Sequence, residues 1–408
     1  MNDSLSGRLG GVSAAEAALY LMAFLLQLGM GIMAPVLPEV KDTFGVSTAA
    51  VSLTISAYGF ARLALDLPAG VFVERLPPFR LFLAGTAIIS LGALLGSLAT
   101  RFELVILARA VMGAGSALCM LTSQYNLSRL STAENRGRVL GYYQAAMLAG
   151  SSFSPAIGGA IAVVAGWRSS FAFCAFTALL AFLSVVLTQR RPLAVSAGQA
   201  VRAVRQAGAQ TTAPGLLANL LVINCITFAM FFHTSGFVNT FVPLFGDTRF
   251  GLDAAAIGLA ISLGTVVRFF TSVVGGNLSD RFGRRRVLLP GLALTGTGVL
   301  LFSQTGGLTL YLAGIVVMAM GRFGNSLPTT LIIDQTPPRL WGRTLGINRF
   351  TGDLGAVLGP LALGWVIDHF ELGAAVYVTG ALIWIVTVLA LVALREAPRG
   401  RAAVAGPD

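Results

Sequence analysis

Two pairs of opposite charges lie inside long apolar stretches of the chain, where charged side chains are unusual. Arg62 and Asp66 are four residues apart, and Arg349 and Asp353 have the same spacing, so each pair falls on one face of a helix. A charge inside an apolar helix is costly and is expected to face a partner or a cavity. The two carboxylates are candidates for binding and releasing a proton, with the arginines as their partners. The alternative is that each pair only neutralises itself within its own helix.

Further polar residues interrupt the apolar stretches singly. Arg268 and Arg322 have no acid at helical spacing, so they either find partners on other helices or face a cavity, where they would favour an anionic or zwitterionic ligand. Arg109 stands alone in its apolar stretch, and the plainer alternative for it is that it binds main-chain carbonyls of the first helix. Neutral polar residues also interrupt the apolar stretches, among them Gln27, His233, Asn239 and Asn325.

The composition indicates which elements position these residues. The 408-residue chain is 55% hydrophobic and 11% charged, with a mean hydropathy of +0.80, whereas a soluble domain carries about 25% charged residues. Lipid is therefore the expected solvent, in which a spanning helix needs about 20 mostly apolar residues. Twelve stretches qualify, at approximately 15–37, 48–71, 79–99, 103–126, 139–164, 169–188, 215–245, 253–275, 286–305, 308–331, 344–368 and 372–394. We predict an all-α membrane protein with 12 transmembrane helices.

The basic residues predict how these helices are oriented. With a cytoplasmic N-terminus, nineteen of the 28 basic residues fall in cytoplasmic loops and tails and four in outer loops, which predicts that both termini are cytoplasmic. The net charge of +11 is spread over loops rather than gathered on one face, which argues against a nucleic-acid partner. The polar stretch 189–214 predicts a linker between six-helix bundles at 1–188 and 215–394, followed by a cytoplasmic tail at 395–408.

A charged segment recurs along the chain. The second hinge, as we call residues 276–286, has five charges within seven residues between two apolar stretches, and its candidate residues are Gly276, Asp280, Arg281, Gly283, Arg284 and Arg285. A weaker copy lies 206 residues earlier, and this first hinge contains Gly70, Glu74 and Arg75. Arg62 and Arg268 keep the same offset. The chain is therefore predicted to contain two copies of one six-helix unit, which is the plan of secondary transporters.

A second repeated motif consists of small residues and proline. The segment from Gly150 to Gly159 matches the segment from Gly355 to Gly364 at an offset of 205. Small residues allow close helix packing in membranes, and proline permits bending. The expected packing positions are Gly150, Pro155, Gly158, Gly159, Gly359 and Pro360.

These motifs together resemble those of the major facilitator superfamily, from end to end of the chain. The second hinge resembles that family's cytoplasmic loop signature, G-x-L-x-D-R-x-G-R-R, at every fixed position. Arg109-x-x-x-Gly113-x-Gly115 is similar to its second motif, and this similarity implies that Arg109 controls proton transfer. The segment from Gly150 to Gly159 is similar to the motif of proton-driven antiporters, with Ser154 in place of one glycine. Gly29-x-Gly31-x-x-x-Pro35-x-x-Pro38 resembles the first-helix pattern of the twelve-helix drug:proton antiporters.

The resemblance carries several expectations about the site. It implies that the first, fourth, seventh and tenth helices line a central cavity containing Gln27, His233, Asn239 and Asn325. It also implies that the second and eleventh helices meet at the cytoplasmic side, where Arg62, Asp66, Arg349 and Asp353 would gather. The first hinge has Pro77-Pro78-Phe79 where the signature has Gly-Arg-Arg, so the second hinge is expected to be the stronger lock between conformations.

We therefore predict a proton-coupled antiporter of the inner membrane that exports small molecules, as multidrug efflux proteins do, by alternating access. Its expected partners are a small-molecule substrate, protons and lipid, and it is expected to work as a monomer. Alternatives are a dedicated exporter of an anionic or zwitterionic metabolite such as a siderophore, an uptake symporter, and a membrane enzyme or sensor. The sequence contains no Gly-x-x-x-x-Gly-Lys phosphate-binding motif and no metal-ligand spacing, so we predict no catalysis, metal or cofactor.

Overall fold

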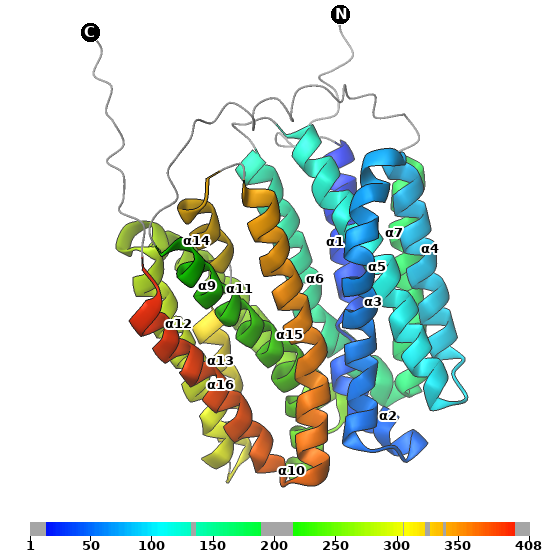
Figure 1. Cartoon of the computed structure of the whole chain (residues 1–408). Helices are drawn as coiled ribbons and strands as arrows, with labels where there is room; N and C mark the ends of the chain where they lie inside the picture. The colour runs from blue at the N-terminus through cyan, green and yellow to red at the C-terminus, as the bar shows by residue number, and fades with distance from the viewer. Residues whose placement is uncertain are drawn as a thin grey trace, which may run out of the picture.

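The chain folds into a bundle of long helices (Figure 1). The structure is a computed structural model and describes residues 14–131, 136–188, 215–304, 306–322, 327–337 and 340–395, among which there is no strand. The predicted linker at 189–214, the tail beyond Arg395 and the candidate Asn325 lie outside the described residues. So do the side chains of Asp280 and of residues 67–75, which include the first-hinge candidates Gly70, Glu74 and Arg75.

The first half of the bundle consists of helices α1 to α7. Their bounds are α1 Ala14–Met30, α2 Met33–Phe44, α3 Thr48–Arg75, α4 Pro78–Ser97, α5 Phe102–Leu130, α6 Arg136–Ala165 and α7 Trp167–Thr188. The second half runs from α9 to α16. Its bounds are α9 Leu216–Phe232, the π-helix η1 His233–Phe241, α10 Val242–Phe250, α11 Ala254–Phe282, α12 Arg284–Leu301, the 3-10 turn η2 Phe302–Gln304, α13 Leu308–Gly321, α14 Leu327–Gln335, α15 Trp341–His369 and α16 Leu372–Ala393.

The described part of the chain has eleven helical segments that are long and apolar enough to cross a membrane. The predicted stretch at 308–331 is a shorter apolar helix, α13, followed by α14, with residues 323–326 outside the described part. Large apolar side chains cover the outside of the bundle, and Leu98, Leu187 and Val392 are each more than 70% exposed. Lipid is the solvent in which such an exposed surface is stable. The chain is therefore an all-α, multi-pass membrane protein.

Consecutive long helices run up and down between two ends of the bundle, which we name for reference. The hinge end holds the end of α3 at Arg75, the junction of α11 and α12 at Gly283, and the start of α15 at Trp341. The far end holds α2 and α10 and lies at the bottom of Figure 1. The first described residue of α1 and the last residue of α16 both lie at the hinge end.

The internal repeat extends to the turns of the far end. Gly45 ends α2 and Gly251 ends α10, both in the left-handed region with φ of 60° and 61°. Glycine adopts this conformation without the steric cost that a side chain brings. Two residues later in each copy, a side chain caps the next helix, because Ser47 Oγ accepts from the Ala50 amide and Asp253 Oδ1 from the Ala256 amide. These matched turns aim α3 and α11 back across the bundle in the same way.

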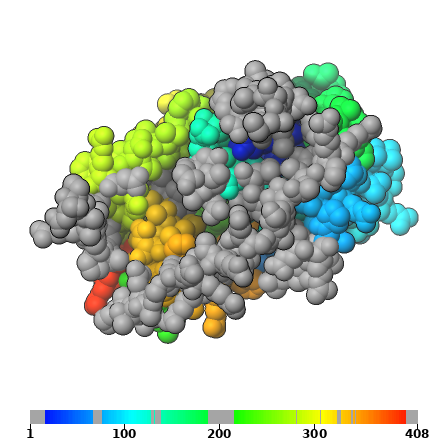
Figure 2. All heavy atoms as spheres, turned by 90° about the horizontal axis from the view of Figure 1, so that it is seen from above, coloured from blue at the N-terminus to red at the C-terminus, as the bar shows by residue number. Residues whose placement is uncertain are grey.

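Each half has its own buried core. Leu19, Met22 and Phe82 belong to one cluster of the first half, and Ile223, Leu288 and Leu331 belong to one cluster of the second half. Seen from the hinge end, the blue and cyan helices of the first half lie on one side and the yellow-green and orange helices of the second half on the other (Figure 2). The candidate site lies where two pairs of helices join these halves.

Candidate functional site

The structure brings the two charged pairs together, and it pairs them between helices. The Arg62 guanidinium on α3 donates to Asp353 on α15, with 2.7 Å between Nη2 and Oδ1. Arg349 on α15 donates in turn to Asp66 on α3, with 2.8 Å between Nε and Oδ2. The pair within α15 is much looser, because Arg349 Nε lies 3.9 Å from Asp353 Oδ2. The four residues therefore form two crossed ion pairs between the halves.

The crossed ion pairs leave part of the cluster without partners. Asp66 Oδ1 and Asp353 Oδ2 are buried and have no hydrogen-bond partner among the described residues. The Asp353 side chain is 5% exposed and that of Asp66 is 13% exposed. Each carboxylate thus holds an arginine with one oxygen and keeps the other oxygen available for a proton.

The α3/α15 contact continues from the cluster to the far end. Ser56 donates to the Val357 carbonyl at 2.7 Å, and a Cβ at Gly364 would lie 2.6 Å from Ser52 Oγ. At the far end of this contact, the Asp368 carboxylate accepts hydrogen bonds from the amides of Thr48 and Ala49 at 2.9 and 2.7 Å. It thereby caps the start of α3. The contact between these helices thus runs from the Asp66–Arg349 ion pair, toward the hinge end of both helices, to Asp368 at the far end. Small residues such as Gly364 allow the backbones to approach in the far half.

A second contact between the halves, α6/α11, is related to the first by the internal repeat. Side chains at Gly159 and Gly258 would collide with the carbonyls of Ala254 and Pro155, so only glycine permits this approach. The Ala156 amide donates to Ser262 Oγ at 3.0 Å across the same contact. Pro155, which has no amide hydrogen, lies within α6 at this approach. Both contacts close the far half of the bundle.

The remaining packing candidates bind helices within each half. A side chain at Gly150 would collide with the Phe24 carbonyl on α1, and one at Gly158 would collide with Ile32. Gly359, next to Pro360 on α15, packs against the Phe232 carbonyl of α9. The repeated motif thus joins α6 to α1 and α15 to α9 in equivalent ways. Ser154, which replaces a glycine of the motif, donates to the Leu28 carbonyl at 2.6 Å.

Arg109 lies in the far part of α5 and is buried, with 5% of the residue exposed. Its Nε donates to the Thr54 carbonyl at 3.3 Å, which is on α3 and not on the first helix as the plainer alternative expected. Its guanidinium lies 4.7 Å from the centre of the Tyr58 ring, a cation–π distance. Tyr58 is one helical turn from Arg62. Arg109 therefore supports the helix that carries half of the charged cluster.

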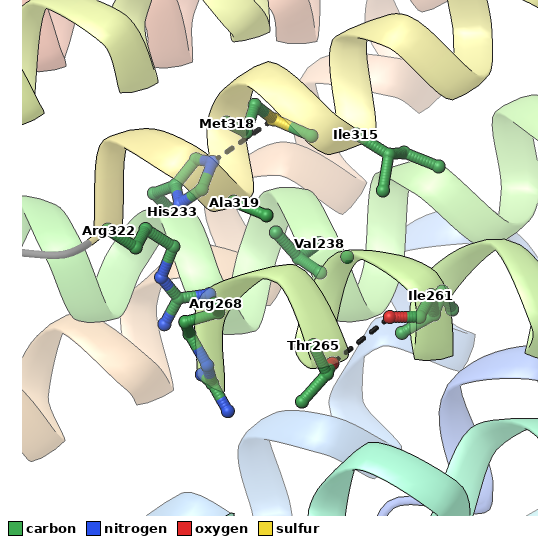
Figure 3. A pocket seen from close by; sticks show the side chains of 10 residues that line it. His233, Val238, Ile261, Thr265, Arg268, Ile315, Met318, Ala319 and Arg322 are labelled. Atoms are coloured by element: carbon green, nitrogen blue, oxygen red, sulfur yellow. Dashed lines mark hydrogen bonds between the residues drawn. The ribbon is translucent and has the colours of Figure 1, made fainter. Parts of the chain in front are cut away.

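Arg268, Arg322 and His233 line one pocket of the second half, which we call the arginine pocket (Figure 3). They come from α11, from the C-terminal end of α13 and from η1. Apolar side chains complete the wall, among them Val238, Ile261, Ile315 and Met318. His233 is 1% exposed and its Nε2 lies 3.3 Å from Met318 Sδ. The structure thus places these three candidates together as a cationic site with an apolar wall.

The other cavity candidates do not join this pocket. Gln27 lies on α1, where its Cβ is 3.0 Å from the position of a Cβ built on Gly150. Asn239 lies on η1 and is half-buried, but it is not among the residues that line the arginine pocket. The structure therefore separates Gln27 and Asn239 from the group around Arg268.

The second hinge is a tight junction between α11 and α12. Gly283 has φ 104° and ψ 150°, a conformation that belongs almost only to glycine. Arg284 pairs with Asp334 at 3.3 Å, and Arg285 donates to the Leu391 carbonyl. Arg281 is exposed. A Cβ at Gly276 would meet nothing within 4 Å among the described residues, so this motif glycine permits no close helix approach in this conformation.

Comparison with known proteins decides the family. The model of the Major Facilitator Superfamily matches residues 19–266 and 225–407, which together cover most of the chain. The chain belongs to the major facilitator superfamily. It is similar to "Multidrug resistance protein 1" of Bacillus subtilis (strain 168), with 26% identity covering 85% of this chain and 87% of that protein. It is also similar to "Multidrug efflux pump LfrA" of Mycolicibacterium smegmatis, with 23% identity covering 87% and 81%.

Solved structures agree with this fold. A bacterial homolog to the human lysosomal transporter Spinster, in an inward-facing and occupied conformation, superposes with a TM-score of 0.78 at 18% identity and covers 94% of this chain and 97% of that chain. This major facilitator superfamily protein is thus a membrane transporter. Its described residues contain no group of three or more His, Cys, Asp or Glu placed to hold a metal ion.

Sequence reasoning missed two residues of this superfamily member's site. Tyr58 donates to Ser116 Oγ at 2.7 Å and lies under Arg109, and its four-residue spacing to Arg62 was the available signal. Asp368 caps a helix of the other half. Its position at the end of an apolar stretch is typical of a solvated loop acid, and no feature of the sequence predicts that it reaches across to α3.

Proposed function

We propose that this transporter exports small molecules in exchange for protons by alternating access, with the crossed ion pairs between α3 and α15 as the coupling element. The observation that carries the proposal is that Arg62 and Arg349 each bind the carboxylate of the other half. At each of the two carboxylates, a proton therefore competes with an arginine of the other half, and the arginine binds only when the far end is closed. The names of the multidrug relatives support export rather than uptake.

The proposed cycle follows from this competition. With the hinge end in the cytoplasm, as the distribution of loop arginines predicts, the conformation described above is closed toward the outside. Forming the ion pairs on closure favours deprotonated Asp66 and Asp353, so protons leave toward the cytoplasm. Opening the far end breaks the ion pairs, and each free carboxylate then binds a proton from the outside. The proton gradient thereby drives the conformational change, since its two states bind protons with different affinity.

The second hinge and Arg109 have supporting roles in this proposal. In the opposite conformation the hinge ends of the two halves close, and we propose that Arg281 and Asp280 then help to hold them. Arg109 keeps α3 in position through Thr54 and Tyr58 while the cluster exchanges protons. We propose that the α3/α15 and α6/α11 contacts rearrange within one chain, so that a monomer completes the cycle.

The test is transport by the purified protein in proteoliposomes with an imposed pH gradient. The panel contains ethidium, tetracycline and a hydrophobic carboxylate, and uptake of each is measured with the liposome interior acidic and again with no gradient. We expect at least one compound to accumulate only when protons can flow outward. Equilibration of every transported compound at the same rate with and without the gradient would refute proton antiport.

A further inference from the structure

The arginine pocket holds two cations to which the described residues supply no counter-charge. Arg322 is 8% exposed, and no carboxylate among the described residues lies within ion-pair distance of it or of Arg268. Residues 323–326, next to Arg322 in the chain, contain no acid either. Arg268 Nε is buried and has no hydrogen-bond acceptor among the described residues. A buried charge is normally paired or hydrogen-bonded, so a bound anion would stabilise this arrangement.

The two arginine side chains also line the same pocket. Figure 3 shows Arg268 and Arg322 on neighbouring helices at one side of this pocket. The close packing of α11 on α13 fixes this placement, because a Cβ at Gly264 would lie 2.7 Å from Ile315 Cγ2. Two like charges held together away from water are stabilised by an anion that contacts both.

The internal repeat explains why Arg268 is unpaired among the described residues. Arg268 occupies the position in α11 that Arg62 occupies in α3, 206 residues earlier. Asp353, the partner of Arg62, corresponds at the 205-residue offset of α6 and α15 to Leu148. Likewise Ser272 stands in α11 where Asp66 stands in α3. One copy of the unit thus pairs its arginine with an acid of the other half, and the second copy has lost both acids and kept the arginine.

We propose that the arginine pocket binds the oxyanion group of an amphipathic substrate, a carboxylate or a phosphate. This inference rests on the proposed function, because it assigns the substrate class of that transporter. Guanidinium groups bind such oxyanions through paired hydrogen bonds. Val238, Ile261 and Ile315 provide the apolar wall against which the rest of the molecule lies. The anion has two possible sources, a free organic acid and the headgroup of an anionic phospholipid.

Binding is measured on the purified full-length protein in phosphatidylcholine nanodiscs with three fluorescent probes that share one apolar body. Pyrenebutyrate is an anion, pyrenebutanol is neutral and pyrenebutylamine is a cation. The wild type is expected to bind pyrenebutyrate at least about tenfold more tightly than the alcohol, because hydrogen bonds to charged groups are strong. The binding assay uses no pH gradient, so its result does not depend on whether transport is coupled to protons. A failure to prefer the anion would likewise leave the result of the proteoliposome assay unchanged.

Variants identify the binding group. Arg268→Gln and Arg322→Gln should each weaken the preference for pyrenebutyrate, and the double variant should abolish it. Arg268→Lys and Arg322→Lys keep the positive charge and should retain part of the preference for pyrenebutyrate. Arg101→Gln is the matched control, since it removes one exposed arginine at the far end. Gel filtration and thermal melting of each variant show whether the fold is intact, and the lysine variants keep the test decisive if a glutamine variant fails to fold.

The source of the anion is tested by adding phosphatidylglycerol to the nanodiscs. An arginine-dependent preference that phosphatidylglycerol does not weaken supports a free organic acid. A preference that phosphatidylglycerol abolishes in the wild type supports a phospholipid headgroup, and both results support the anion site. Equal affinities of the wild type for the three probes, or an unchanged preference in a folded double variant, would overturn the proposal.

Discussion

Asp353 takes its short hydrogen bond from Arg62, 291 positions earlier in the chain, and not from Arg349 one turn before it on the same helix. The interatomic distances are 2.7 Å and 3.9 Å. An ion pair within one helix would survive any movement of the two halves. An ion pair between halves must break when α3 and α15 separate at this point. The ion pairs therefore form or break with the conformation, and protonation of their carboxylates changes which conformation is favoured.

The first prediction concerns the two carboxylates. Asp353→Asn and Asp66→Asn should each abolish transport driven by a pH gradient, because neither asparagine can exchange a proton. Asp353→Asn should also lower the stability of the far-closed state, by about 3–5 kcal/mol if Arg62 is left as an uncompensated buried charge. Glu103→Gln, which neutralises an exposed acid at the far end, is the control. Gradient-driven uptake by both aspartate variants at the wild-type rate would contradict the prediction.

The second prediction tests whether the ion pair acts as a pair. The double variant Arg62→Gln/Asp353→Asn should be more stable than Asp353→Asn alone, since it leaves no unpaired charge. Its gradient-driven transport should still be lost. Thermal melting of the single and double variants gives the coupling energy. Additive effects of the two substitutions on stability would show that the 2.7 Å contact has no energetic role.

The third prediction concerns the cap that joins the halves at the far end. Asp368→Ala should favour opening there, because the Thr48 and Ala49 amides lose their acceptor. Loss of a helix N-cap costs typically about 1 kcal/mol, which changes the ratio of two states roughly fivefold. Spin labels at the exposed Val164 and Leu308 in a cysteine-free background report the distance across the far end. Labels at Leu187 and Val392 report the hinge end. An unchanged distance distribution at both ends would refute this role.

The fourth prediction separates the glycines of the second hinge. Gly283→Ala should lower stability by about 1–3 kcal/mol, because its backbone conformation is strained for any side chain. Gly276→Ala should leave the stability of this conformation unchanged, since its Cβ meets nothing within 4 Å. A transport defect in Gly276→Ala with normal stability would indicate that the close approach occurs in the opposite conformation. Equal melting temperatures for the two variants would contradict the assignment.

The fifth prediction compares the two hinges by transport rate. Neutralising Asp280 or Arg281 should reduce transport more than neutralising Glu74 or Arg75, because the first hinge carries Pro77-Pro78-Phe79 in place of glycine and arginines. The measurement is initial uptake by the four variants at matched protein density. Equal losses would mean that the departure of the first hinge from the signature has no mechanical consequence.

The lengths of the apolar stretches and the internal repeat were the features of the sequence that predicted most of the helices. Apolar length predicted the helices because lipid requires every backbone group to be satisfied within the segment. The π-helix at His233–Phe241 was not foreseen, since an apolar stretch has the same composition whether its hydrogen bonds span four or five residues. The equivalent turns at Gly45 and Gly251, which share the repeat offset, were not predicted from the sequence.

The sequence predicted which residues form the charged cluster, but it did not predict which of them contact one another. Four-residue spacing identified Arg62, Asp66, Arg349 and Asp353, but the same spacing is compatible with ion pairs inside each helix. Only the relative placement of α3 and α15 decides between the two arrangements, and that placement depends on glycines far from the charges. Gly276 illustrates the same limit, because a motif glycine indicates that some conformation needs it and does not indicate which one.

The most direct test of proton coupling is the distance across the far end as a function of pH. In wild-type protein labelled at Val164 and Leu308, acidification should shift the population from the short distance of the closed state toward a longer one, because protonated Asp66 and Asp353 release their arginines. In Asp66→Asn/Asp353→Asn the longer distance should dominate at every pH. A double variant that keeps the wild-type pH response would contradict the account, since the crossed ion pairs would then have no part in coupling.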